Sequence, residues 1–385
     1  MPRAVRTLIL LGSSLTALAV ARVAHRRGLH CVMLDNTPGP AAPTRGATFR
    51  RLRNADMASV TESTRDLPQD DTVAVVADSD RWLRFVSAHR AELSVGNRRV
   101  LHPSSAAIET CLDKSAFLRW CEQHELAAPR WYEPHEAEAL DASAYPLMLR
   151  PEWTQHSTPT GLPKAIEIRE ASQLRYWLDR YRAVAVTPSI CTSLLRPGLR
   201  QFSVGAARDA KGRVRTFLAE KVRPQAEQCA GGTFVRPAVH PAAEQLAARA
   251  LDAIEFFGVA EVEVLFDPET QAAHLIEINA RPWLQYGLPY ACGCDLFGHV
   301  FEEPAENARA ADHSHAWLYF SSDLYACFAR DTGLLTQSKI GFAEYLSSLV
   351  RADVYATWDW RDPLPLLASA SQTASGWIKQ RLRRS

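Results

Sequence analysis

The segment from Ala260 to Trp283, AEVEVLFDPETQAAHLIEINARPW, alternates acidic and amide side chains with apolar ones. Glu261–Phe266 has the composition of a strand, Asp267–Thr270 is a turn signal, and His274–Ile278 has strand composition again. The pattern therefore predicts a β-hairpin that carries polar side chains among residues typical of a protein core.

The spacing predicts that the polar side chains of this hairpin lie together. Every second side chain of a strand shares a face, so Glu261 and Glu263 share one, as do Glu277 and Asn279. If the strands pair so that these faces coincide, Glu263, Glu277 and Asn279 form one cluster of oxygen atoms. Arg281 follows immediately after the cluster.

Two carboxylates and an amide oxygen suit Mg²⁺, which prefers a few protein oxygens together with substrate phosphates. An adjacent arginine suits a phosphate or an acyl-phosphate oxygen. The alternative is that the acids lie on a solvated hairpin face. The core-type residues Ile276 and Ile278 on either side of Glu277 favour a site.

The run Glu277–Trp283, EINARPW, resembles the E-I-N-x-R metal-binding signature of the ATP-grasp superfamily. In that family the preceding strand supplies another acid, as Glu263 does in this sequence. The resemblance implies a mixed α/β and α+β protein with the ATP-grasp fold and an N-terminal Rossmann-like pre-ATP-grasp domain. It also implies ATP and Mg²⁺ as cofactors.

The length, net charge and cysteine content are ordinary for a soluble globular protein. A length of 385 residues predicts two or three domains. The formal net charge of +1 gives no electrostatic reason to expect nucleic acid as a partner. The eight cysteines show no CxxC spacing of the zinc type, so we expect reduced thiols in a cytoplasmic protein. The sequence leaves a homodimer open.

The N-terminus permits two interpretations. Basic residues, the apolar run Leu8–Leu11 and small residues follow in the order of a secretory signal. However, Gly12 interrupts the apolar run, which is too short to span a bilayer. A strand at Val5–Leu11, a helix at Leu15–Arg27 and a strand at His30–Leu34 instead predict a βαβ unit, which we favour.

Asp35 after the second strand also raises a nicotinamide-dependent oxidoreductase as a hypothesis. Of the G-x-G-x-x-G pattern only Gly12 is present, which disfavours it. ATP-grasp enzymes commonly begin with a Rossmann-like domain that does not bind the nucleotide. The resemblance implies such a domain over residues 1–105, continued by a strand at Val73–Ala77 and a helix at Asp80–His89.

The resemblance implies an ATP-grasp domain over residues 106–300. A small clamping subdomain would cover residues 128–192, and a metal-binding subdomain would cover residues 193–300. Residues 301–385 would form a C-terminal extension, whose basic end we interpret as a solvated helix terminus rather than a membrane contact.

Three basic residues are implied to bind the nucleotide phosphates. Lys114 follows Asp113 in a predicted helix over Ala106–Leu126, as a D-K pair does in the family. Arg150 stands where the family carries a strand lysine, and Lys164 is the candidate for the missing ammonium. The alternatives are a solvated helix face for Lys114 and a strand-edge charge for Lys164.

Other positions resemble the adenosine-binding part of the family. Leu194 and Leu195 begin a segment similar to the hinge whose backbone pairs with adenine. Strands are predicted at 183–186 and 192–195, so the hinge begins at the end of the second strand and precedes the next hairpin. Gln201 stands where a ribose-binding glutamate is common, and its amide can still hydrogen-bond hydroxyl groups. Lys221 and Arg223 resemble a basic pair that faces the substrate; a charged edge strand is the alternative.

The resemblance implies an ATP- and Mg²⁺-dependent carboxylate–amine ligase acting on small molecules, with Arg281, Lys221 and Arg223 as catalytic residues. The substrate carboxylate would attack the γ-phosphate of ATP, and an amine would displace phosphate from the resulting acyl phosphate. The alternative is a nucleotide-binding relative without catalysis, which the departures at Arg150, Leu194 and Gln201 favour.

Overall fold

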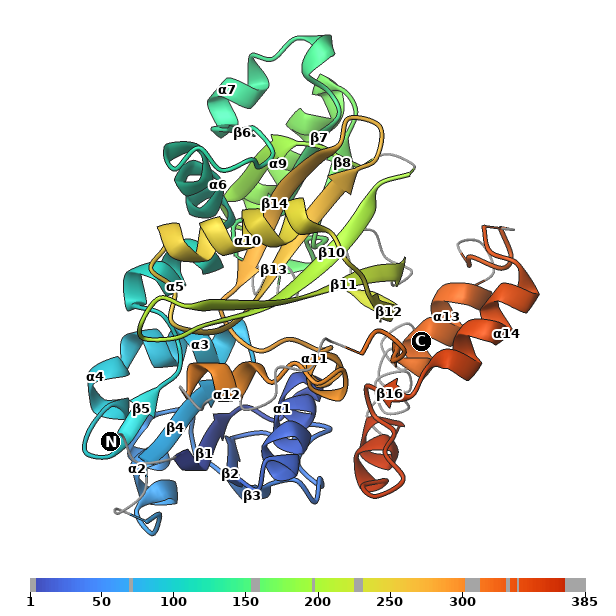
Figure 1. Ribbon diagram of the computed structural model, residues 1–385. Helices are drawn as coiled ribbons and strands as arrows, with labels where there is room; N and C mark the ends of the chain where they lie inside the picture. Colours follow the sequence, from blue (N-terminus) through green and yellow to red (C-terminus); the bar gives the residue numbers. More distant parts are fainter. Residues whose placement is uncertain are drawn as a thin grey trace, which may run out of the picture.

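The computed structural model describes residues 5–68, 72–153, 160–195, 198–224, 231–301, 312–329, 333–337 and 339–370. Within these residues the strands form three sheets, of five, seven and four strands. In Figure 1 the five-stranded sheet lies at the bottom, the seven-stranded sheet in the middle and the four-stranded sheet at the top.

The five-stranded sheet is parallel and has the order β3-β2-β1-β4-β5. Leu8 and Leu10 of β1 belong to the core around α1 (Leu15–Arg26), whereas Ile9 belongs to the core that contains Trp82 of α3 (Asp80–Ala88). Both faces are therefore covered, which explains the uninterrupted apolar runs. The strands are β1 Val5–Leu11, β2 His30–Asp35, β3 Thr48–Arg51, β4 Thr72–Ala77 and β5 Arg98–Val100.

The predicted βαβ unit at the N-terminus is confirmed. This part of the chain also contains a strand and two helices that the sequence did not predict. The edge strand β3 and the short helices α2 (Met57–Thr64) and α4 (Arg90–Leu93) are additional. Asp56 begins α2, because its side chain accepts a hydrogen bond from the backbone N–H of Ser59 at 2.8 Å.

The single helix predicted over Ala106–Leu126 is wrong. The structure has two helices, α5 (Ser105–Leu112) and α6 (Lys114–Gln123). Asp113 separates them, because its backbone is extended and its side chain accepts a hydrogen bond from Ala116 N at 2.8 Å. Lys114 consequently stands at the first position of a helix.

The four-stranded sheet has the order β6-β9-β7-β8 and packs against α9 (Ala171–Ala183). The strands predicted at 183–186 and 192–195 are wrong, because Ala183 still belongs to α9 and the intervening strand ends at Thr192. Ala185 has a φ of +52°, which places a turn there. The remaining elements are β6 Trp131–Tyr132, α7 Pro134–Glu138, the 3₁₀ turn η1 Ala142–Ala144, β7 Leu147–Pro151, β8 Ile166–Ile168 and β9 Pro188–Thr192.

The seven-stranded sheet has the order β14-β13-β10-β11-β12-β15-β16 and is covered on one face by α10 (Pro241–Ala253). The predicted hairpin at its edge is confirmed as β13 and β14. The sequence Gly231-Gly232-Thr233 favours a loop, but Gly232 and Thr233 begin strand β12. The strands are β10 Arg200–Arg208, β11 Val214–Pro224, β12 Gly232–Pro237, β13 Gly258–Asp267, β14 Ala272–Asn279, β15 Trp317–Leu318 and β16 Val354–Tyr355.

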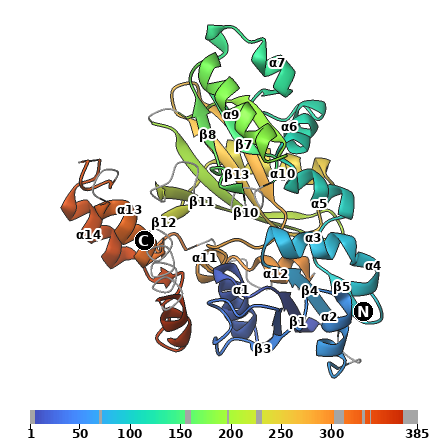
Figure 2. The same cartoon turned by 180° about the vertical axis from the view of Figure 1, so that it is seen from behind.

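The parallel sheet and the seven-stranded sheet meet closely. Helices α11 (Gly287–Ala291) and α12 (Leu296–Val300) lie between them (Figures 1 and 2). At Gly258, φ is +113°, and a Cβ atom would lie 2.4 Å from the carbonyl oxygen of Leu101. Only glycine permits this approach of the two backbones.

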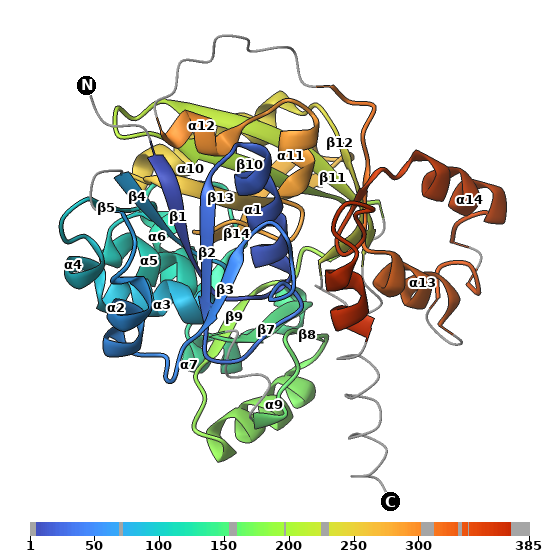
Figure 3. The same ribbon diagram turned by 90° about the horizontal axis from the view of Figure 1, so that it is seen from below.

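Two further helices, α13 (Phe320–Phe328) and α14 (Phe342–Arg351), lie beside each other at the far side of β12 and project from the body of the molecule (Figure 3). The sequence did not predict α13. The sequence Leu296–Asn307 favours one helix, but α12 ends at Val300, and residues 302–307 lie outside the described part of the chain. No helix in the described ranges combines the length and the apolar character needed to cross a membrane.

Candidate active site

The hairpin β13–β14 brings its polar side chains to one face of the seven-stranded sheet. Glu263 pairs with Glu277 across the two strands, and Glu261 pairs with Asn279. Paired residues of antiparallel strands point to the same side. The opposite face of the hairpin, which includes Val262 and Ile278, packs in the core with α10.

Glu263 is the centre of this cluster. Its Oε1 atom lies 2.5 Å from Nζ of Lys221, and its Oε2 atom accepts a hydrogen bond from the amide of Gln201 at 2.9 Å. Asn279 donates its amide N–H groups to Glu277 at 3.3 Å and to Glu261 at 3.1 Å. The structure therefore brings together Glu263, Glu277 and Asn279 from the predicted metal set, together with Lys221 and Gln201.

Glu261 belongs to the cluster although it was not predicted as a site residue. It is 4% exposed, and it accepts hydrogen bonds from Ser203 Oγ at 2.5 Å and from Asn279 at 3.1 Å. Lys221 Nζ lies 3.2 Å from it. The sequence signal was available, since Glu261 stands two residues before Glu263 on the same strand face.

Lys221 is a buried cation between two carboxylates. Burial alone lowers the pKa of its ammonium group, but Glu261 and Glu263 outweigh burial and hold that pKa above its ordinary value. Lys221 therefore stays charged at neutral pH and balances part of the negative charge of the cluster.

Arg281 connects the cluster to the parallel sheet. Its Nε atom donates to Asp80 at 2.8 Å, and its terminal nitrogens donate to the carbonyl of Pro282 at 3.1 Å and to Oδ1 of Asn279 at 3.3 Å. Burial lowers the pKa of the guanidinium, but Asp80, Glu261 and Asp78 raise it by more. Arg281 is thus charged and held beside the amide oxygen of Asn279.

His102 forms a second connection between the same parts. It is 1% exposed, it accepts a hydrogen bond from Ala77 N at 2.8 Å, and its Nδ1 atom lies 2.9 Å from the carbonyl oxygen of Ala280. Nδ1 must therefore carry the proton, and the ring is neutral. The end of β4 and the residue before Arg281 are joined by one side chain.

Arg223 does not lie with Lys221, contrary to the expectation of a basic pair. A β-bulge follows Lys221, so that Lys221 pairs with Val235 and Arg223 pairs with Phe234, the neighbouring residue of β12. Successive residues of a strand point to opposite faces, so the bulge turns Arg223 away from the carboxylates. Arg223 instead donates to Asp323 of α13 at 2.7 and 2.9 Å.

Lys114 lies near Glu277 and also near Arg150. Burial lowers the pKa of the Lys114 ammonium; Glu277 opposes this effect and Arg150 adds to it, which places both groups nearby. Arg150 is 9% exposed on β7, opposite Ser189. Its buried Nε atom has no hydrogen-bond partner among the described residues. A buried donor of this kind suits an anionic ligand.

The other predicted nucleotide residues are further from the cluster or partly outside the described chain. Lys164 lies exposed in the bend before β8, and no described contact links it to the carboxylates. Leu194 and Leu195 are half-buried after β9, and Leu195 packs against the main core. The resemblance also implies a loop over the phosphates at Trp153–Gly161, of which residues 154–159 lie outside the described residues. Residues 196–197 of the predicted hinge lie outside them as well.

The donor chemistry of the cluster fits Mg²⁺ held jointly with phosphates. The described residues contain no group of three or more histidine, cysteine, aspartate or glutamate side chains arranged to hold a metal ion by themselves. Glu263, Glu277 and Oδ1 of Asn279 nevertheless offer hard oxygen atoms, and Mg²⁺ commonly takes one or two carboxylates and completes its shell with phosphate and water.

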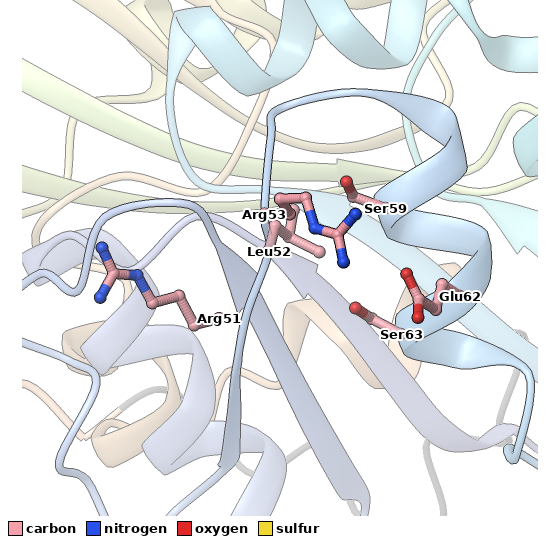
Figure 4. A pocket seen from close by; sticks show the side chains of 6 residues that line it. All are labelled: Arg51, Leu52, Arg53, Ser59, Glu62 and Ser63. Carbon is pink, nitrogen blue, oxygen red and sulfur yellow. The ribbon is translucent and has the colours of Figure 1, made fainter.

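Two hollows of the surface lie away from the carboxylate cluster. One, of about 530 Å³, is formed at β3 and α2 by Arg51, Leu52, Arg53, Ser59, Glu62 and Ser63. Figure 4 shows Arg53 directed towards Ser59 and Glu62, whereas Arg51 extends away from them. A second, of about 270 Å³, lies between α1, α11 and β16. Neither includes a residue of the carboxylate cluster.

No family model matches the sequence, and neither does any curated protein. Solved structures do match. N5-carboxyaminoimidazole synthetase from Staphylococcus aureus, complexed with ADP, is 13% identical with a TM-score of 0.61, and the alignment covers 80% of each chain.

Two other solved structures are similar. The biotin carboxylase domain of 2-oxoglutarate carboxylase from Hydrogenobacter thermophilus, in complex with MgADP and bicarbonate, is 12% identical with a TM-score of 0.60, over 80% of this chain and 72% of that one. N5-carboxyaminoimidazole synthase from Aspergillus clavatus, with ADP and aminoimidazole ribonucleotide, is 17% identical with a TM-score of 0.56, over 80% and 79%. At these identities the likeness shows the fold.

Proposed function

Because the chain has the ATP-grasp fold, we propose that it is an ATP- and Mg²⁺-dependent ligase that joins a small-molecule carboxylate to an amine. The observation that carries the proposal is the pairing of Glu263 with Glu277 beside Asn279, which puts a hard-oxygen set on one sheet face. A protein that only binds adenine has no need of paired acids at this position.

The proposed binding mode follows from the positions of the charges. Glu263, Glu277 and Asn279 would hold Mg²⁺, which neutralises and orients the phosphates of ATP. Lys114 lies near Glu277 and Arg150, and both basic side chains would contact the phosphates. Gln201 would reach the ribose, and the backbone near Leu194 and Leu195 would contact the adenine. Lys164 would approach only if its segment moves.

The proposed reaction has two steps. The substrate carboxylate attacks the γ-phosphorus of ATP, the bond to the β–γ bridging oxygen breaks, and ADP leaves with an acyl phosphate remaining. The amine then attacks the acyl carbon, phosphate leaves, and the amine loses a proton. Catalysis of this kind consists mainly of placement and charge stabilisation. Arg281 and Lys221 would supply fixed positive charge beside the transferred phosphate.

The proposal is tested by titrating ATP with and without Mg²⁺ into the protein, and by following ADP release with panels of acids and amines. We expect Glu277→Gln to abolish Mg²⁺-dependent nucleotide binding, because one carboxylate of the metal set is lost. Glu269→Gln, on the exposed turn of the same hairpin, is the matched control and should behave as wild type. Nucleotide binding that does not depend on Mg²⁺ would contradict the proposal.

A nucleotide-binding protein without catalysis is the second candidate. Both oxygens of Glu263 already accept hydrogen bonds from protein side chains, Lys221 and Gln201, which favours a closed and inactive arrangement. The two candidates differ in one result. Binding of ATP with Mg²⁺ but no ADP release with any acid and amine pair would favour the second.

A further inference from the structure

Helices α13 and α14 expose apolar side chains at regular helical spacing. On α13, Phe320, Leu324 and Phe328 follow one another at intervals of four residues, and each is between 43% and 51% exposed. Tyr325, which is three residues before Phe328 and therefore borders the stripe at that end, is 62% exposed. Residues four apart lie on one face of a helix, so these side chains form a continuous apolar stripe.

Helix α14 repeats the pattern. Phe342, Leu346 and Val350 are again four residues apart and are 60%, 46% and 87% exposed. The ring of Phe328 contacts Tyr345 of α14 at 5.5 Å between centroids, so the two helices are neighbours. An exposed stripe of this kind on each of two adjacent helices is unusual for a monomer.

We propose that the α13–α14 face, formed by Phe320, Leu324, Tyr325, Phe328, Phe342, Leu346 and Val350, is the interface with the same face of a second copy of this chain. Pairing two identical faces about a two-fold axis gives a closed dimer, the commonest symmetric assembly. The proposal does not depend on the proposed function.

The area of the face is sufficient for such a dimer. Aromatic side chains bury about 150–250 Å² each, so the four half-exposed rings and the three aliphatic side chains offer roughly 600–700 Å² per copy. Two copies together would then bury about 1,300 Å², which exceeds the ~1,000 Å² expected of a specific interface.

The charge of the face disfavours a membrane surface. In α13 and α14 the charged residues are Asp323, which is buried, and the exposed Glu344 and Arg351. Helices that lie on anionic membranes carry several basic residues beside their apolar stripe. Helices α13 and α14 together contain one basic residue, Arg351.

The C-terminal segment of the chain is too poor in apolar residues to cover the face. Residues 371–385, SQTASGWIKQRLRRS, contain only Trp377, Ile378 and Leu382 as large apolar side chains. Seven exposed side chains on two helices require more apolar partners than this segment has. A second copy offers a matching set.

The two helices are also held rigidly, which favours association. Asp323 of α13 is fully buried and binds the Arg223 guanidinium, whose third nitrogen donates to Ser348 of α14 at 2.7 Å. One side chain of β11 thus fixes both helices before any partner binds. A face that is already ordered loses less entropy on binding.

The test is the mass of the full-length protein by light scattering and analytical ultracentrifugation across a wide dilution series. We expect a dimer that dissociates on dilution, and we expect Val350→Glu to weaken dimerisation at least about tenfold, because a charge would be buried without a partner. Leu346→Ser should weaken it less. Thermal unfolding and circular dichroism establish that each variant is folded.

The matched control is Val95→Glu, the same substitution at a valine that is 66% exposed on the loop before β5. It should leave the dimer intact, and so should Ile378→Glu in the C-terminal segment. A wild-type protein that is monomeric at every concentration would overturn the proposal. Equal weakening by Val350→Glu and Val95→Glu would overturn it as well, because the α13–α14 face would then have no special role.

Discussion

Glu261 fixes the geometry of the predicted metal ligands without being one of them. It accepts a hydrogen bond from the Asn279 amide, which leaves Oδ1 of Asn279 free to face Arg281 and a metal ion. It also lies 3.2 Å from Lys221. Replacing a partner that orients a ligand in this way commonly lowers metal affinity about 10–100-fold.

The substitution Glu261→Gln tests this role. It keeps the size of the side chain but removes the charge that holds Lys221, and the new amide could face Asn279 with the wrong group. We expect the Mg²⁺ dependence of nucleotide binding to weaken about 10–100-fold, measured by titrating Mg²⁺ at fixed ATP. Unchanged Mg²⁺ dependence together with lower thermal stability would show that Glu261 serves the fold alone.

Arg150 gives a second prediction at the same scale. Its Nε atom is buried without a partner among the described residues, so the side chain costs stability in the absence of a ligand. We expect Arg150→Met to leave the melting temperature of the free protein equal or higher. Nucleotide affinity should fall about 10–100-fold, the value of a charge-assisted hydrogen bond.

Arg150→Lys separates charge from shape, because it keeps the charge but not the fork of the guanidinium. An intermediate nucleotide affinity is the expected result. Arg169→Met, at an exposed position after β8, is the control and should change neither quantity. A clear loss of stability in Arg150→Met would show that the arginine supports the fold rather than a ligand.

The alternation of residues predicted most of this cluster but could not reveal irregularities of the strands. Glu263, Glu277 and Asn279 were found because pairing two regular strands is the default expectation. The position of Arg223 was predicted wrongly, because no residue pattern in the sequence indicates the β-bulge after Lys221. The bulge depends on the pairing with β12, a strand that was itself not predicted.

At the scale of elements, His102 joins β4 to the end of β14, and this contact depends on pH. Burial lowers the pKa of His102 to about 4, whereas an unfolded histidine titrates near 6.5. Between these values the unfolded chain binds more protons than the folded one, so stability rises with pH. The contribution, about 3 kcal/mol, is complete above pH 6.5 and is lost as the pH falls towards 4.

We therefore expect the free energy of unfolding to fall more steeply between pH 6.5 and 4.5 in wild type than in His102→Gln, whose amide can donate and accept but does not titrate in this range. Urea unfolding at several pH values measures the difference. His30→Gln, at an exposed histidine, should retain the wild-type slope. Parallel slopes for wild type and His102→Gln would contradict the assignment.

The elements themselves were predictable where the signal is continuous. The strand Val5–Leu11 was predicted to the residue, because the apolar run Leu8–Leu11 ends at Gly12 and is followed by a helical pattern and a second strand. The division of Ala106–Leu126 was missed, because aspartate is tolerated inside a helix and begins one only when its side chain caps it. The run at 183–186 was too short to distinguish a strand from a helix end.

At the scale of the whole molecule, a buried ion pair attaches the C-terminal helices to the seven-stranded sheet. Arg223 and Asp323 are 4% and 0% exposed, and Thr233 also donates to Asp323 at 2.7 Å. The sequence could not predict this pair, because the partners are far apart in the chain. Removing one partner of a buried pair leaves an uncompensated charge, which typically costs about 3–5 kcal/mol.

Arg223→Met should therefore destabilise the protein strongly, and residues 312–370 should become sensitive to limited proteolysis before the rest of the chain. Replacing both partners, as Arg223→Met with Asp323→Leu, should recover much of the stability, because apolar side chains of similar size can replace a buried pair. Arg182→Met, which removes two exposed ion pairs, one to Asp179 of α9 and one to Glu138 of α7, should have no measurable effect. If the double variant is less stable than Arg223→Met, the hydrogen bonds of Asp323 to Thr233 outweigh its pairing with Arg223, and the sheet holds these helices through the threonine instead.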